Sequence, residues 1–232
     1  MKQVKVGVVG FGTVGAGVVR LLIDHAPLIE KRLGFPLTLA GVADLDVTTD
    51  RGVQIPPGLL TTDAEALIDD PSVPLIVELI GGLEPARTFT LRALAQGKSV
   101  VTANKALLAH HWSDLCRAST EKGGRLWFEA SVGGGIPVIR ALREGLAANR
   151  IQSIHGIING TSNYIMTRMS EEGLEFETAL RQAQEKGYAE ADPTLDIEGG
   201  DSSLICKTSD LPCDHGKTLT VFASLFRFNR RV

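Results

Sequence analysis

The first 15 residues contain the feature that most constrains the fold, an apolar strand that leads directly into three spaced glycines. The strand is Val4–Val9, and the residues that follow are Gly10-Phe11-Gly12-Thr13-Val14-Gly15, with the spacing G-x-G-x-x-G. A β-branched run bounded by glycine is typical of a buried parallel strand. In this setting Gly10 permits a tight turn, Gly12 lets the backbone approach a pyrophosphate, and Gly15 allows a helix to pack closely on the strand. Residues 10–15 therefore predict a dinucleotide site, with the glycines of an ordinary turn as the alternative.

Strand and helix signals alternate through the rest of the first 130 residues. Short apolar runs typical of strands are Val4–Val9, Leu37–Ala43, Leu75–Leu79, Ser99–Thr102 and Arg125–Ala130. Helical patterns lie between them, at Val14–Ile29, Asp63–Ile68, Pro85–Gln96 and Lys105–Lys122. Because strands that alternate with helices pair in parallel, this order predicts an α/β domain over residues 1–130, with a doubly wound parallel sheet of the Rossmann type.

The pattern changes after Gly133. Helices are expected at Pro137–Asn149, Ser162–Gly173 and Phe176–Lys186, and a strand at Gln152–Ile158. This mixture predicts that residues 131–232 form a second, α+β substrate domain.

Charge and hydropathy argue against several classes of partner. The 24 Lys and Arg against 27 Asp and Glu give a net charge of −3, so no basic excess is present to hold nucleic acid or anionic lipid. No stretch reaches the roughly 20 apolar residues of a membrane span, and the start is too short in apolar residues for a signal peptide. Cys116, Cys206 and Cys213 fit neither a disulfide framework nor a zinc site. We expect a cytoplasmic protein whose partner is a small molecule, with no nucleic acid and no membrane.

Polar residues follow two of the predicted strands. Asp44 and Asp46 come after the second strand, where an acid can accept hydrogen bonds from a ribose diol and favour NAD. A solvated loop acid is the alternative, and Arg51 can instead favour a 2′-phosphate. Lys105 follows the fourth strand, at the sheet edge where ligands bind in such folds. It can anchor a nicotinamide ribose or a substrate carboxylate, or it can be a surface lysine at a helix start.

Two later loops are candidates for cation and substrate sites. Residues 129–137 combine a carboxylate with three glycines whose carbonyl oxygens are exposed, a donor set that suits a hard cation, although a hinge between domains is the alternative. Further on, five carboxylates lie close together and can hold a substrate ammonium group or form a solvated acidic loop. They are Glu190, Asp192, Asp196, Glu198 and Asp201.

Five motifs, in this order, resemble homoserine dehydrogenase: VGVVGFGTVGAGVV, VTANKALLA, EASVGGGIPVI, INGTSNYIMTRM and GYAEADPTLDIEGGD. The resemblance covers residues 1–201 and implies the reversible, NAD(P)H-dependent reduction of L-aspartate-4-semialdehyde to L-homoserine. It places that reaction in the biosynthesis of threonine, methionine and isoleucine. It also implies a homodimer, and it implies that residues 131–232 are an incomplete α+β domain that binds substrate and forms the dimer contact.

The resemblance assigns roles to single residues. It places the cofactor pyrophosphate on Phe11, Thr13 and Val14, and the nicotinamide beside Lys105. It identifies Glu190 as the carboxylate that binds the substrate amino group and Asp201 as an active-site acid, and we add Asp196 to this substrate set. It also implies a sodium ion, three of whose four protein ligands bind through carbonyl oxygens. The sodium ligands are Glu129, Val132, Gly134 and Ile136.

The chain departs from the family pattern after the acidic loop. The family has a catalytic lysine where this chain has Ile205. Gly216–Leu225 resembles the family helix that begins at this point, so we interpret Ser202–Cys213 as an inserted or misread segment. The candidates for the displaced catalytic lysine are Lys217 and Lys207.

Two functional hypotheses follow from this departure. One is an active homoserine dehydrogenase. The other is a shortened, catalytically impaired member that keeps NAD(P) binding, because the family continues beyond the last residue of this chain and because losing a general acid lowers a rate by about 10²- to 10⁴-fold.

Overall fold

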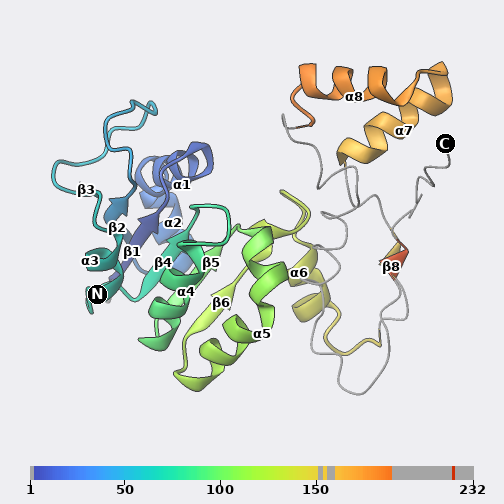
Figure 1. Cartoon of the computed structure of the whole chain (residues 1–232). Helices are drawn as coiled ribbons and strands as arrows, with labels where there is room; N and C mark the ends of the chain where they lie inside the picture. The colour runs from blue at the N-terminus through green and yellow to red at the C-terminus, as the bar shows by residue number, and fades with distance from the viewer. Residues whose placement is uncertain (1–2, 151–153, 156–159, 190–220, 223–232) are drawn as a thin grey trace. The chain divides into compact units, whose positions relative to one another are not determined.

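The computed structural model describes residues 3–150, 154–155, 160–189 and 221–222 (Figure 1). The chain divides into two compact units, residues 1–139 and residues 140–232, and each is described by itself. The predicted boundary after residue 130 falls within the first unit.

The first unit is built on a six-stranded sheet in which every neighbouring pair is parallel. The strand order is β3-β2-β1-β4-β5-β6. The strands are β1 (Val4–Val9), β2 (Leu37–Ala43), β3 (Leu60–Thr61), β4 (Leu75–Glu78), β5 (Ser99–Thr102) and β6 (Arg125–Trp127). The chain winds outward from β1 in one direction and from β4 in the other, so the sheet is doubly wound and its ligand crevice is expected at the carboxyl ends of β1 and β4. The predicted fold class is confirmed.

Helices cover both faces of this sheet. They are α1 (Thr13–Asp24), α2 (Ala26–Leu33), α3 (Ala64–Asp69), α4 (Ala86–Ala95) and α5 (Lys105–Glu121). Figure 1 shows α1 and α2 behind the sheet and α3, α4 and α5 in front of it. Right-handed crossovers on either side of a switch point place helices in this way. Among the described residues, none of the helices has the length and apolar character that crossing a membrane would require.

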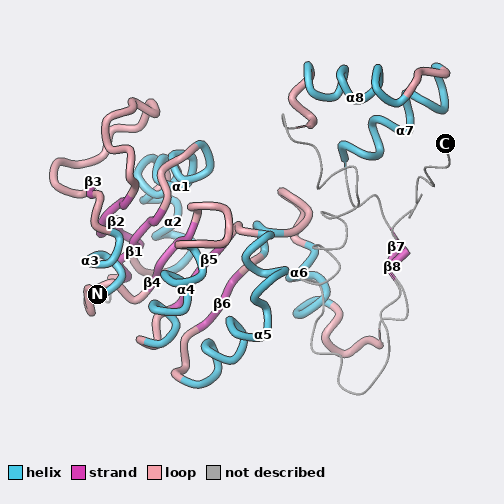
Figure 2. The backbone as a smooth tube through the Cα atoms, viewed as in Figure 1, coloured by secondary structure: helices cyan, strands magenta, loops and turns pink. Residues whose placement is uncertain are grey.

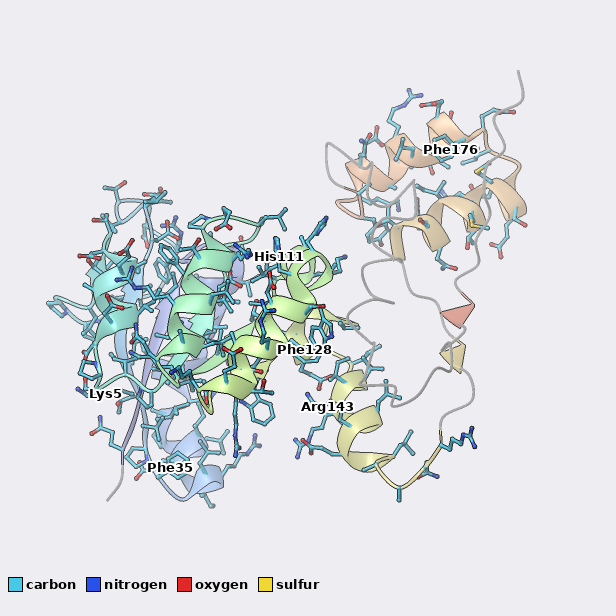
Figure 3. All side chains as sticks on the ribbon, turned by 60° about the horizontal axis from the view of Figure 1, so that its bottom comes forward. Lys5, Phe35, His111, Phe128, Arg143 and Phe176 are labelled. Atoms are coloured by element: carbon cyan, nitrogen blue, oxygen red, sulfur yellow. The ribbon has the colours of Figure 1, made fainter. Side chains whose placement is uncertain are left out.

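Two glycines within strands let α3 lie close to the sheet. A Cβ atom at Gly7 would lie 3.0 Å from Cγ of Leu67, and one at Gly41 would lie 2.9 Å from Cδ1 of the same leucine. At the other end of the sheet lies Phe128, which follows β6 and is labelled in Figure 3. Its ring contacts that of Trp112 in α5 edge-on, with centroids 5.0 Å apart. These contacts bury apolar area between helices and sheet, which is the main stabilising contribution in such a layer.

Three expectations for the first unit need correction. The strand expected over Arg125–Ala130 ends at Trp127, and Glu129–Ser131 form a 3₁₀ turn instead. The helix expected over Val14–Ile29 is divided into α1 and α2, because His25 leaves the helical conformation (φ −107°, ψ 14°). Pro27 follows in the first turn of α2, and proline has no N–H to continue the hydrogen bonds of α1. The sheet also gains β3, which the sequence did not reveal because a strand of two residues has no periodicity to detect.

The second unit contains two helices that pack as a pair, α7 (Gly160–Glu172) and α8 (Phe176–Glu185) (Figure 2). Their shared core includes Ile165, Ala179 and Ala183. The helix expected over Pro137–Asn149 is shorter, with α6 at Val138–Arg140 and a π-helical turn at Ala141–Gly145.

A short two-stranded sheet corrects a further prediction in this unit. The strand β7 (Ile154–His155) pairs in parallel with β8 (Val221–Phe222). Residues 221–222 are therefore extended, and the helix expected over Gly216–Leu225 is wrong at these two positions. The tertiary pairing with β7 supplies backbone partners that a local helix pattern does not anticipate.

Acid is expected to destabilise the first unit. Hydrogen bonds from Thr49 and Thr48 hold the pKa of Asp46 well below its usual value, and a hydrogen bond from Arg92 lowers the pKa of Asp69. Because these bonds exist only in the folded state, their stabilisation is present above the ordinary carboxyl pKa of about 4 and is lost as the pH falls toward the lowered values. Urea midpoints should be constant from about pH 7 to 5 and fall below about pH 4. The Asp69→Asn variant should show a smaller fall, and an equal fall in both proteins would contradict this origin.

Candidate cofactor-binding site

Two of the three glycines that follow β1 are required by the protein's own packing. Gly10 has φ +100°, and a Cβ atom there would lie 2.5 Å from the carbonyl carbon of Leu79 and 2.7 Å from the nitrogen of Ile80. A Cβ atom at Gly15 would lie 2.1 Å from the carbonyl oxygen of Gly10. The turn thus packs against the end of β4 on one side and against α1 on the other, with no room for a side chain at either position.

Gly12 differs from its two neighbours in the motif. It is the N-cap residue of α1, its φ of −67° is accessible to any residue, and a Cβ atom there would have no atom of a described residue within 4 Å. Neither backbone strain nor internal packing therefore calls for glycine at this position. The open space lies at a helix N-terminus, where N–H groups and the helix dipole favour an anion such as a phosphate.

Asp44 lies beside this turn, at the carboxyl end of β2. Its Oδ2 accepts a hydrogen bond from the backbone N–H of Phe11 at 2.5 Å, and its Oδ1 accepts one from the N–H of Asp46 at 2.9 Å. Each carboxylate oxygen can accept more than one hydrogen bond, so both retain capacity for a ribose diol. The structure thus brings Asp44 together with the predicted phosphate turn.

Arg51 reaches the same place from the loop after β2. Its guanidinium lies over the ring of Phe11, 5.3 Å from the centroid. It forms an ion pair with Asp46 at 3.0 Å and donates to the backbone carbonyls of Asp46 and Thr49. Together with Asp44, these side chains carry two negative charges and one positive charge around the Phe11 segment.

A buried polar cluster at the ends of β4 and β5 was not anticipated from the sequence. Glu78 is only 1% exposed, and its carboxylate accepts hydrogen bonds from the backbone N–H of Ile80 at 2.9 Å and from the hydroxyl of Thr102 at 2.6 Å. Glu78 and Thr102 are register partners in the sheet. The available signal was a glutamate that ends an otherwise apolar run, LIVE.

Lys105 is the first residue of α5, and the residue before it fixes the helix start. The side-chain Oδ1 of Asn104 accepts the N–H of Leu107 at 2.9 Å, which is a standard N-cap bond. Its Nδ2 donates to the carbonyl of Gly82, in the loop after β4, at 2.7 Å. The structure thus places Lys105 at the carboxyl edge of the sheet, where the sequence predicted it.

The proposed cation loop follows β6. Glu129 lies in a 3₁₀ turn, and its Oε1 accepts the N–H of Ile139 at 2.9 Å. Gly133 and Gly134 adopt left-handed conformations, with φ of 71° and 58°, and the carbonyl of Ile136 accepts the N–H of Val138. Within the described ranges, no group of three His, Cys, Asp or Glu side chains is arranged to hold a metal.

The predicted substrate and catalytic residues Glu190, Asp196, Asp201, Lys207 and Lys217 lie outside the described residues. What the structure does describe is the segment directly before Glu190. In the second unit, the hydroxyl of Thr161 in α7 donates to the carbonyl of Tyr188 at 2.6 Å, and the rings of Tyr164 and Tyr188 pack with centroids 5.1 Å apart. These contacts join two of the motifs quoted above, NGTSNYIM and GYAEADP.

Two family models match the chain. Residues 10–129 match the model described as homoserine dehydrogenase, NAD binding domain, and residues 137–206 match the homoserine dehydrogenase model. The division between the two matches falls after the sheet of the first unit.

Known proteins of this family are similar in both sequence and structure. The chain is 47% identical over 203 residues to homoserine dehydrogenase of Synechocystis sp. and 45% identical to that of Bacillus subtilis. These alignments cover 86% and 88% of this chain but 46% and 47% of the relatives, so the chain spans about half their length. A solved homoserine dehydrogenase from Thiobacillus denitrificans is 47% identical, with a TM-score of 0.80 over 89% of this chain and 48% of that one.

Proposed function

Because this chain belongs to the homoserine dehydrogenase family, a family of oxidoreductases, we propose that its first unit binds NAD(P)H and that the chain interconverts L-homoserine and L-aspartate-4-semialdehyde. The observation that carries the cofactor assignment is the glycine turn. Gly10 and Gly15 are explained by internal contacts, whereas no contact with a described residue requires a glycine at position 12, which lies at the N-terminus of α1 where an anion is favoured. The proposed setting is the biosynthesis of threonine, methionine and isoleucine.

The charges beside the turn support a preference for NADH over NADPH. Asp44 can accept hydrogen bonds from a free 2′-hydroxyl, and its carboxylate would repel a 2′-phosphate. Arg51 is the cation that could compensate, but its ion pair with Asp46 already offsets its charge. The residual charge of these three side chains is negative, which disfavours the additional phosphate.

Lysine chemistry supports the proposed reaction. Reduction of an aldehyde by hydride transfer develops negative charge on the aldehyde oxygen, and a positioned ammonium group stabilises that charge and can supply the proton. Lys105 stands at the sheet edge as the candidate on the nicotinamide side. Lys217 and Lys207 stay candidates for the proton donor.

We also retain sodium as a proposal for the loop after β6. The ligands would be the carboxylate of Glu129 and the carbonyls of Val132, Gly134 and Ile136. This set of oxygen donors suits a hard cation, and the left-handed Gly133 and Gly134 allow the loop to turn its carbonyls toward one point. The homodimer and the cytoplasmic location stay predictions.

A fluorescence titration of the 232-residue chain tests the cofactor proposal. We expect NADH emission to increase on binding, and NADPH to bind about tenfold more weakly because of the charge beside its 2′-phosphate. The Asp46→Asn variant removes the partner of Arg51, so its NADPH affinity should rise toward that for NADH. A folded chain that binds neither nucleotide would refute the assignment, and equal affinities in the wild type would refute the preference.

Turnover distinguishes the two functional hypotheses. With homoserine and NAD⁺, an active enzyme produces NADH that is followed by its absorbance. A chain that binds NADH but shows no turnover at saturating homoserine would be the NAD(P)-binding, catalytically impaired member of the family.

A further inference from the structure

The buried cluster at the ends of β4 and β5 has a role that the cofactor turn does not supply. The carboxylate of Glu78 accepts the N–H of Ile80 on one oxygen and, on the other, the hydroxyl of Thr102, which lies 24 residues further along the chain than Glu78. Within the described part of the chain, no cationic side chain is paired with it. A buried carboxylate held only by neutral donors is costly to maintain, so its retention calls for an explanation.

The hydrogen bonds continue from Thr102 into the start of α5. The hydroxyl oxygen of Thr102 accepts the N–H of Asn104 at 3.0 Å, and Asn104 donates in turn to the carbonyl of Gly82 at 2.7 Å. Gly82 and Ile80 both lie in the loop after β4, so this series of hydrogen bonds begins and ends in the same loop. It closes a ring of hydrogen bonds that fixes this loop against the first turn of α5.

The ring borders the candidate cofactor site on two sides. Gly10 of the phosphate turn packs directly against the peptide that joins Leu79 to Ile80, and it is this peptide's N–H that Glu78 holds. On the side of the ring formed by α5, Lys105 directly follows Asn104. The hydroxyl of Ser131, after β6, also donates to the carbonyl of Thr102 at 2.9 Å, so a third segment of the sheet edge joins the cluster.

We propose that Glu78, Thr102 and Asn104 are positioning residues that hold the loop after β4 and the start of α5 in the conformation that receives the nicotinamide half of the cofactor. This inference rests on the proposed NAD(P)H binding. Ordering a loop on binding costs conformational entropy and so weakens affinity. Because the cluster orders this loop beforehand, it increases cofactor affinity without touching the cofactor. Glu78 suits this role because its two side-chain oxygens can hold both donors at once.

Two matched variants of Thr102 test this role. Thr102→Val keeps the shape of the side chain but removes the hydroxyl, which leaves one oxygen of Glu78 and the N–H of Asn104 without their partner. Thr102→Ser keeps the hydroxyl and removes only a methyl group. We expect the dissociation constant for NADH, measured by fluorescence titration, to rise about tenfold in Thr102→Val and to stay within about twofold of wild type in Thr102→Ser.

A second variant covers the case in which Thr102→Val does not fold. Asn104→Asp keeps a good N-cap for α5 but replaces the donor to Gly82 with an acceptor, so folding is retained while the ring opens. Its NADH dissociation constant should also rise about tenfold. Folded variants that bind NADH as tightly as wild type would overturn the positioning role and leave the cofactor assignment intact. A wild-type chain that does not bind NADH would overturn both.

Discussion

Replacing Gly12 with serine is expected to leave the first unit folded and to weaken NADH binding by about 10- to 100-fold. The new Cβ atom meets no atom in the part of the chain that the structure describes, and the backbone of Gly12 is already in a conformation that serine adopts. Serine is moreover a better N-cap than glycine, so the thermal midpoint should stay the same or rise slightly. The loss falls on binding because the added atoms occupy the space through which a pyrophosphate would approach the helix N-terminus.

Thermal unfolding and NADH titration on the same samples separate these two effects. Gly12→Ala serves as a second variant, because it adds the Cβ atom without a hydroxyl that could itself bond to phosphate. Gly17→Ala is the matched control, since Gly17 is an exposed position in the same helix and an added Cβ there has no contact within 4 Å among the residues described. If Gly12→Ser bound NADH as tightly as Gly17→Ala, the open space at Gly12 would not be the phosphate site.

Replacing Gly15 with alanine is expected to have the opposite pattern, with a loss of about 3 kcal/mol in the free energy of unfolding. The added Cβ would lie 2.1 Å from the carbonyl oxygen of Gly10, far inside van der Waals contact. The obstructing atom belongs to the backbone of a tight turn, so no side-chain rotation relieves the contact. Helix α1 must move away from β1, which also loosens the apolar contacts that α1 makes with the sheet.

Urea unfolding measures this loss directly, and the thermal midpoint should fall by about 10 °C. Gly17→Ala is again the control, because replacing glycine by alanine at an exposed position within a helix should stabilise the protein by about 0.5–1 kcal/mol. A Gly15→Ala variant as stable as Gly17→Ala would show that the turn relaxes without cost. If both expected results are obtained, binding and folding depend on different glycines of one motif.

The element order of the first unit could be predicted from the sequence, and the reasons are local. A parallel strand buried on both faces requires a run of apolar, largely β-branched residues, as in β1 and β4, and such runs are visible without knowledge of the fold. The prediction was wrong where local pattern carries little information. It missed β3, and it placed a helix across residues 221–222, which pair with β7 instead.

The candidate site could be predicted only in part. The glycine turn and Asp44 could be singled out because motif spacing and the end of a strand are sequence features, and their role in cofactor binding stays a prediction. Glu78 and Thr102 were missed because neither belongs to a motif, and their partnership depends on the register between β4 and β5. Hydrogen bonds across a sheet join residues that are distant in sequence, so no window of the chain contains this signal.

The sequence by itself determined the fold class and the position of the phosphate turn, since both depend on residue types in consecutive positions. The tertiary structure alone decided which glycines of that turn are required by packing within the protein. The distances from Gly10 to Leu79 and from Gly15 to Gly10 make two of them necessary for packing. An added Cβ at Gly12 would meet no atom of a described residue, so packing does not require the third glycine, and its role toward a ligand stays a proposal. A spacing rule states where glycines occur, but only the positions of neighbouring atoms show which contacts require them.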